Sequence, residues 1–173
     1  MSTMKEVKVK ELTADAFKPY GSYANMTKPT GHKMGGFHPD LAIMTLGKAN
    51  EAAFSITQVL KKENIIDAIE CHDHTGEGIL PLDGDVLVHV APASRKDKVL
   101  LDQIEVFRVP KGTLLTLRPG VWHCAPFAEN NDVVNVLVIL PERTYVNDIY
   151  FYRIPKDEQI HIVDVKLKEN NLK

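Results

Sequence analysis

The segment ECHDHTGEGILPLDG, residues 70–84, is the part of this chain that we expect to decide its fold. It contains His72 and His74, two residues apart, and Glu77 three residues further on. A later segment, PGVWH, ends in His123. Three imidazoles and one carboxylate form a plausible ligand set for a metal ion, provided that the fold brings them together.

Composition and charge indicate an ordinary globular chain. The 173 residues are 44% hydrophobic and 25% charged, with a net charge of -2, which fits one domain with a substantial core. No basic block suggests nucleic acid, and the longest apolar run, residues 133–140, is too short to span a bilayer. The charged N-terminus argues against a signal peptide, and Cys71 and Cys124 form no CxxC pair. We therefore expect a cytoplasmic protein without disulfides.

The hydrophobic pattern predicts many short strands separated by turns. Strands are expected at residues 5–12 (an edge strand), 54–60, 69–74, 85–91, 104–109, 113–117, 133–140, 149–154 and 160–165. One helical turn, capped by Thr13, and a long loop at 27–47 complete the pattern. These features favour an all-β antiparallel sandwich or barrel.

We expect a single domain spanning residues 1–173. Its parts would be an N-terminal strand, short helix and loop region at 1–50, the barrel at 51–165, and a polar tail at 166–173.

Alternation along a strand suggests how the candidate ligands meet. His72 and His74 share a face if residues 69–74 are extended, and Glu77 can turn back after Thr75 and Gly76. If the strand that carries His123 is a neighbour, all four groups converge inside the barrel. Imidazole and carboxylate ligands suit zinc, manganese, iron or nickel better than calcium or magnesium, and leave positions open for a substrate.

The two motifs together resemble the signature of the cupin superfamily. The spacing from Glu77 to Gly84, followed by GTLLTLRPGVWH at residues 112–123, is similar to its paired motifs. This resemblance implies a single double-stranded β-helix, or jelly-roll, barrel. It also implies a divalent transition metal held by His72, His74, Glu77 and His123.

A more specific resemblance covers most of the chain. LTADAFKPYG (12–21), RPGVWH (118–123) and PERTYVND (141–148), with the central motif, are similar to the ureidoglycolate lyase family. The resemblance implies a lyase of purine-nitrogen salvage, commonly a homodimer, that splits a small carboxylated ureide into glyoxylate and urea. Family positions are then occupied by Glu70, His72, Trp122 and His123.

The remaining candidates have functional and structural interpretations. Glu70 or Glu77 could act as the base, although Glu70 could equally be a solvated carboxylate at a strand end. Arg118 and Arg143 could bind the substrate carboxylate or form surface ion pairs. Three aromatic residues could line a pocket or belong to the core: Trp122, Tyr145 and Tyr150.

Other functions stay open at this stage. The same ligands on the same barrel could serve a sugar isomerase, a dioxygenase or a non-catalytic metabolite-binding protein, because a fold does not fix a reaction.

Overall fold

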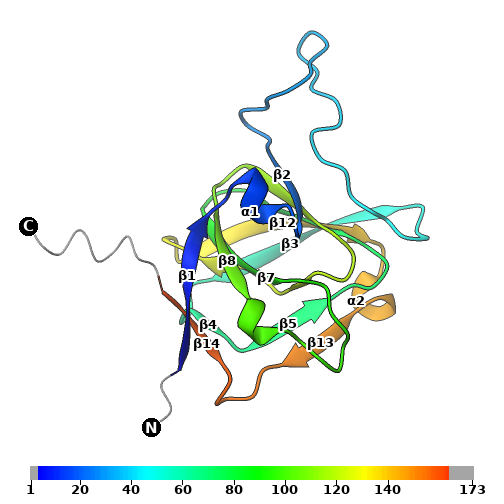
Figure 1. Cartoon of the computed structure of the whole chain (residues 1–173). Helices are drawn as coiled ribbons and strands as arrows, with labels where there is room; N and C mark the ends of the chain where they lie inside the picture. Colours follow the sequence, from blue (N-terminus) through cyan, green and yellow to red (C-terminus); the bar gives the residue numbers. More distant parts are fainter. Residues whose placement is uncertain (1–3, 164–173) are drawn as a thin grey trace, which may run out of the picture.

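The computed structural model describes residues 4–163, which form an almost entirely β structure (Figure 1). The chain-order strands are β1 (Lys5–Glu11), β2 (Gly21–Asn25), β3 (Ala52–Leu60), β4 (Ile65–Ile66), β5 (Ala68–Cys71), β6 (Glu77–Pro81), β7 (Val86–Ala91), β8 (Glu105–Val109), β9 (Thr113–Leu117), β10 (Trp122–His123), β11 (Phe127–Ala128), β12 (Val133–Pro141), β13 (Tyr150–Arg153) and β14 (Ile160–Val163). The helical pieces are α1 (Ala14–Phe17), a 3-10 turn (Leu101–Gln103) and α2 (Thr144–Asn147).

The strands form two curled sheets. The smaller sheet has the order β2-β9-β6-β12-β3 and is antiparallel throughout. The larger has the order β13-β5-β10-β7-β8-β1-β14-β4, with β11 beside β7. The two sheets enclose an apolar core in a jelly-roll barrel of the cupin type, as the sequence predicts.

A second core explains why every residue of β7 is buried. Val86, Val88 and Val90 point into the barrel, whereas Leu87 and Ala91 belong to a separate apolar cluster. Successive side chains of a strand point to opposite faces, so β7 needs apolar cover on both. The second cluster includes Ile66 of β4, Trp122 of β10, Phe127 of β11, Ile154 just after β13, and Ile160 of β14.

Local chemistry determines how the first strands enter the barrel. The Oγ of Thr13 accepts a hydrogen bond from the Ala16 N–H at 3.3 Å and caps α1, as predicted. Gly21 opens β2 against β9, where a Cβ atom would lie 1.8 Å from the carbonyl oxygen of Thr116. Only glycine permits this close approach of two backbones.

Most predicted strands are confirmed, and two expectations are corrected. β1 is not an edge strand, because it pairs in parallel with both β8 and β14. β5 ends at Cys71, three residues early. Within the predicted N-terminal region, 1–50, both β1 and β2 pair with strands of the barrel. The polar tail at 166–173 lies outside the described residues.

Several elements were not predicted. Five strands, β2, β4, β6, β10 and β11, and the helix α2 have five residues or fewer and give little periodicity in the sequence. The loop between β2 and β3 is confirmed and projects from the barrel (Figure 1). Within residues 4–163, no helix has the length and apolar character needed to cross a membrane.

Candidate functional site

Two paired strands of the larger sheet and one strand of the smaller sheet position the site. Glu70 on β5 lies directly opposite His123 on β10, as expected for neighbouring strands. Glu77 begins β6 in the other sheet. The Gly120 N–H donates to the carbonyl of His72 at 2.6 Å, so the Pro-Gly turn holds the two sequence motifs together.

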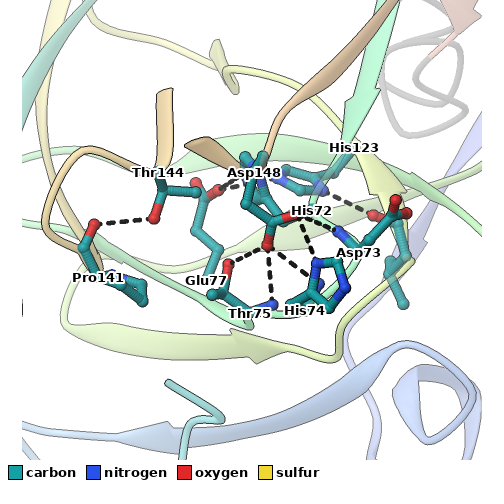
Figure 2. A network of polar contacts seen from close by, with 10 residues as sticks. His72, Asp73, His74, Thr75, Glu77, His123, Pro141, Thr144 and Asp148 are labelled. Atoms are coloured by element: carbon teal, nitrogen blue, oxygen red, sulfur yellow. Dashed lines mark hydrogen bonds and ion pairs between the residues drawn. The ribbon is translucent and has the colours of Figure 1, made fainter. Parts of the chain in front are cut away.

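The carboxylate of Glu77 lies between two buried histidines (Figure 2). Its Oε2 is 3.1 Å from Nε2 of His72 and 2.9 Å from Nε2 of His123. The other ring nitrogens face backbone carbonyls, since Nδ1 of His72 is 2.5 Å from the oxygen of Asp148 and Nδ1 of His123 is 2.9 Å from that of Val121. A carbonyl only accepts, so both Nδ1 atoms carry a proton and both Nε2 atoms face the carboxylate.

This donor set fits a transition metal. Outer hydrogen bonds that fix Nδ1 and present Nε2 are typical of metal-binding histidines. Oε2 of Glu77 lies within 3.1 Å of both Nε2 atoms, close enough for the three atoms to contact one cation. Ligand atoms of Glu70, His72 and His123 also lie within 4.8 Å of one another. The two imidazoles can therefore bind a cation together with a carboxylate from either Glu70 or Glu77.

The two carboxylates have opposite electrostatic environments. Burial alone would raise the pKa of Glu77, but the charge of His123 and hydrogen bonds from both histidines hold it at about 2. Burial also raises the pKa of Glu70, and there the opposing effect of the histidines is smaller. The pKa of His123 is lowered by burial, but Glu77 outweighs this and brings it to about 8. Glu77 is thus a permanent anion, whereas Glu70 is easier to protonate.

A cavity of about 230 Å³ opens onto the cluster. Its lining residues are Thr57, Glu70, His72, Glu77, Ile79, Ala125, Pro126, Val138, Leu140, Tyr145 and Ile149. None of these described residues is a lysine or an arginine. The wall therefore contains two carboxylates, and histidine is the only side chain there that can carry a positive charge. A larger groove of about 660 Å³ lies elsewhere and contains none of the cluster.

His74 does not join the cluster, and the expectation that it shares a face with His72 is wrong. Its side chain is 76% exposed, with Nδ1 3.3 Å from a carboxylate oxygen of Asp148. The physical reason is that β5 ends at Cys71, so strand alternation stops before His72. The carboxylate of Asp148 instead accepts the N–H groups of Asp73, His74 and Thr75 and turns the chain.

The two predicted arginines also lie outside the cavity. Arg118 is exposed, and its Nη1 is 3.4 Å from the carbonyl of Pro19. Arg143 has a left-handed backbone with φ of 60° at the start of α2, and its side chain is 69% exposed beside Glu142. The structure therefore corrects the expectation that either side chain faces the site.

The aromatic candidates divide between wall and core. Tyr145 lines the cavity, whereas Trp122 is fully buried in the second core and packs edge-on against Tyr150 at 5.8 Å. Cys71 is buried, and both cysteines are free. Three contributors were missed: Thr57, Ile149 and Asp148. The motif PERTYVND contains Asp148, but no sequence spacing connects it with a turn more than seventy residues earlier.

The fold and the cluster define a cupin-type barrel with a buried histidine–carboxylate centre. A family model described as ureidoglycolate lyase matches residues 4–161, and the chain belongs to that family. It is 27% identical over 126 residues to a ureidoglycolate lyase from Rhodobacter capsulatus, a match that covers 69% of this chain and 77% of the relative. The chain is accordingly an enzyme of the lyase class.

Solved structures show weaker likeness. A dTDP sugar isomerase from Desulfovibrio desulfuricans G20 matches with a TM-score of 0.43 and 17% identity, covering 80% of this chain and 83% of the isomerase. Bacillus subtilis oxalate decarboxylase, described with Mn(II) centres, matches with a TM-score of 0.42 and 13% identity. That match covers 59% of this chain but only 23% of the decarboxylase.

Proposed function

We propose that this protein is a metal-dependent ureidoglycolate lyase, which converts a small hydroxylated and carboxylated ureide into glyoxylate and urea. The observation that supports this most directly is the apposition of two Nε2 atoms and one carboxylate in a buried cavity. Family membership supports the reaction class and the substrate.

His72, His123 and Glu77 would hold a divalent cation such as zinc, manganese, iron or nickel. The low pKa of Glu77 keeps it anionic, as a ligand must be, and the backbone carbonyls fix both rings. When bound, such a cation supplies Lewis-acid polarisation of the substrate's oxygen atoms. His74, which we expected as a ligand, has no part in this proposal.

The charge of the cavity is a second argument for a cation. An anionic substrate would meet Glu70 and Glu77 in a small cavity, and no arginine or lysine is among the described residues of its wall. Like charges in a poorly solvated site repel one another strongly. A bound divalent cation would offset these negative charges. Apart from histidine, no described residue of the wall can carry a positive charge.

Glu70 is the residue that we propose as the base. Its carboxylate would take the proton from the substrate hydroxyl as the carbonyl of glyoxylate forms and the C–N bond breaks. The same proton would then pass to the departing nitrogen, so that urea leaves neutral and Glu70 returns to its starting state. A raised pKa suits a group that both accepts and returns a proton at neutral pH.

Two substitutions test this proposal. Glu70→Gln should reduce kcat on ureidoglycolate about 10²–10⁴-fold while metal content stays unchanged. Glu77→Gln should instead remove the metal, as measured by elemental analysis. Wild-type protein that carries metal but releases no urea would contradict the lyase assignment. Activity that disappears without oxygen would favour a dioxygenase.

We also propose that the protein forms a homodimer. Phe54, Ile56 and Leu60 lie on the outer face of edge strand β3 and are all exposed. Their partners across the ladder, Ile139, Leu137 and Val133, extend this apolar face over β12. A second copy of the chain could cover it, because homodimer interfaces are more apolar than other protein surfaces.

A further inference from the structure

Asp148 connects the cavity wall with the metal-binding ring of His72. It follows α2, whose Tyr145 lines the cavity, and is itself followed by Ile149, another wall residue. Its side chain is only 14% exposed. Its own N–H donates to the carbonyl of Thr144 at 2.9 Å, so its position is fixed by the helical turn.

The carboxylate of Asp148 is the anchor of the turn that follows β5 (Figure 2). Oδ1 accepts the N–H of Asp73 at 2.8 Å, and Oδ2 accepts those of His74 and Thr75 at 3.0 and 3.1 Å. The Thr75 hydroxyl also donates to Oδ2 at 3.1 Å. Three backbone N–H groups and the Thr75 hydroxyl, with Nδ1 of His74 3.3 Å from Oδ1, hold this turn in a single conformation.

The backbone carbonyl of the same residue accepts from Nδ1 of His72 at 2.5 Å. That bond determines which nitrogen carries the proton and directs Nε2 towards Glu77. Asp148 therefore contacts the His72 ring with its backbone and the three residues after His72 with its side chain. No other described residue forms hydrogen bonds with both.

We propose that Asp148 is a positioning residue for His72, holding its ring in the metal-binding orientation while fixing the α2 side of the cavity. The inference rests on the proposed metal site, in which His72 is a ligand. His123 has no comparable dependence, because its Nδ1 faces the carbonyl of Val121, only two residues earlier in the chain.

The first experiment measures metal affinity by competition with a chelator, using Mn²⁺ and Zn²⁺ as probes. Asp148→Ala keeps the backbone carbonyl that faces His72 but removes the carboxylate that anchors the turn, so binding should weaken about tenfold, the lower end of the range for losing an outer partner of a metal-binding histidine. Asp148→Asn retains the size of the side chain and one acceptor oxygen, so its loss of metal affinity should be smaller. This variant replaces the alanine variant in the experiment if the latter fails to fold. Asp83, in the turn after β6 and away from the site, is the matched control. Its carboxylate accepts hydrogen bonds from the backbone N–H and the side-chain amide of Asn135 on β12. Asp83→Ala should bind metal as the wild type does.

The second experiment does not depend on metal or activity. In metal-free protein labelled with ¹⁵N-histidine, the Nδ1–H signals of His72 and His123 should both resist exchange in the wild type. In the Asp148 variants, exchange of the His72 signal should accelerate while the His123 signal is unchanged. If metal affinity and the His72 signal are both unaltered, Asp148 is not a positioning residue. If the wild type binds neither metal, the proposed function fails, and the ¹⁵N spectra still decide the role of Asp148.

Discussion

Two carboxylates in one cavity differ in role because their immediate partners differ. Glu77 receives hydrogen bonds from two imidazoles, which outweigh its burial and keep it charged. Glu70 is opposite His123 in the ladder, but burial dominates and raises its pKa. Groups whose environments move their pKa values apart are typical of a ligand and a base within one site.

Substitution of single histidines should show that His72 and His123 bind the metal and that His74 does not. His72→Ala and His123→Ala should each lose a near-stoichiometric metal, because each removes one Nε2 donor. His74→Ala should retain it, since that side chain is exposed and faces Asp148. Elemental analysis of protein purified without chelator makes the comparison. Metal loss in His74→Ala equal to that in His72→Ala would contradict the geometry.

His89 should make the stability of the metal-free protein depend on pH. It is fully buried against Phe127, and burial lowers its pKa to about 4 despite an opposing effect of the Ala68 backbone. Between pH 6.5 and 4 the unfolded chain binds a proton that the folded chain does not. The free energy of unfolding should therefore decrease as the pH is lowered from 6.5 to 4, and this residue should account for at most about 3 kcal/mol of the decrease.

The measurement is urea unfolding at pH 7 and pH 4.5 in the presence of a chelator. His89→Leu removes the titrating group but keeps an apolar side chain against Phe127. The variant should lose less stability than the wild type between the two values of pH. An equal loss in both proteins would exclude His89 as a source of the dependence.

At the scale of the elements, short irregular segments determine the site. β5 stops at Cys71, and the turn after it is held by a residue at the end of α2. The Pro-Gly turn before β10 binds the carbonyl of His72. Strands thus supply Glu70, Glu77 and His123, whereas a turn supplies His72.

Glycine at the start of β2 should be irreplaceable. Gly21→Ala would place a Cβ atom 1.8 Å from the Thr116 carbonyl oxygen, which forces β2 away from β9. We expect a loss of about 2 kcal/mol or more, or about 4–8 °C in Tm. Gly36→Ala is the matched control, because no atom lies within 4 Å of the added carbon and φ is not positive there. Thermal unfolding of both variants tests this, and equal Tm values would contradict it.

At the scale of the whole molecule, two apolar cores share one sheet. β7 contributes to both, which ties the barrel to the layer formed by β4, β13 and β14. On the outer face of β3 and β12, Phe54, Ile56, Leu60 and Val133 are exposed, and Leu137 and Ile139 are half-buried. Large exposed apolar patches commonly mark protein interfaces.

The proposed dimer should therefore depend on that face. Ile56→Asp would bring a charge into an apolar interface and, by symmetry, set two such charges near each other. Sedimentation equilibrium should show a dimer for the wild type and a monomer, or a much weaker dimer, for the variant. Val146→Asp changes a comparably exposed apolar residue on α2 and should remain dimeric. A variant at Ile56 that dimerises like the wild type would rule out this face.

The sequence by itself determined the strand alternation, the barrel class and three of the candidate ligands, His72, Glu77 and His123. Alternation is a local property of extended backbone, so it can be read from neighbouring residues. The tertiary structure alone decided that His74 leaves the site, that Arg118 and Arg143 lie outside it, and that Asp148 enters it. Those outcomes depend on where a strand stops and which distant carboxylate accepts the freed N–H groups. A contact between residues more than seventy positions apart has no local signature, because only packing of the complete barrel brings them together.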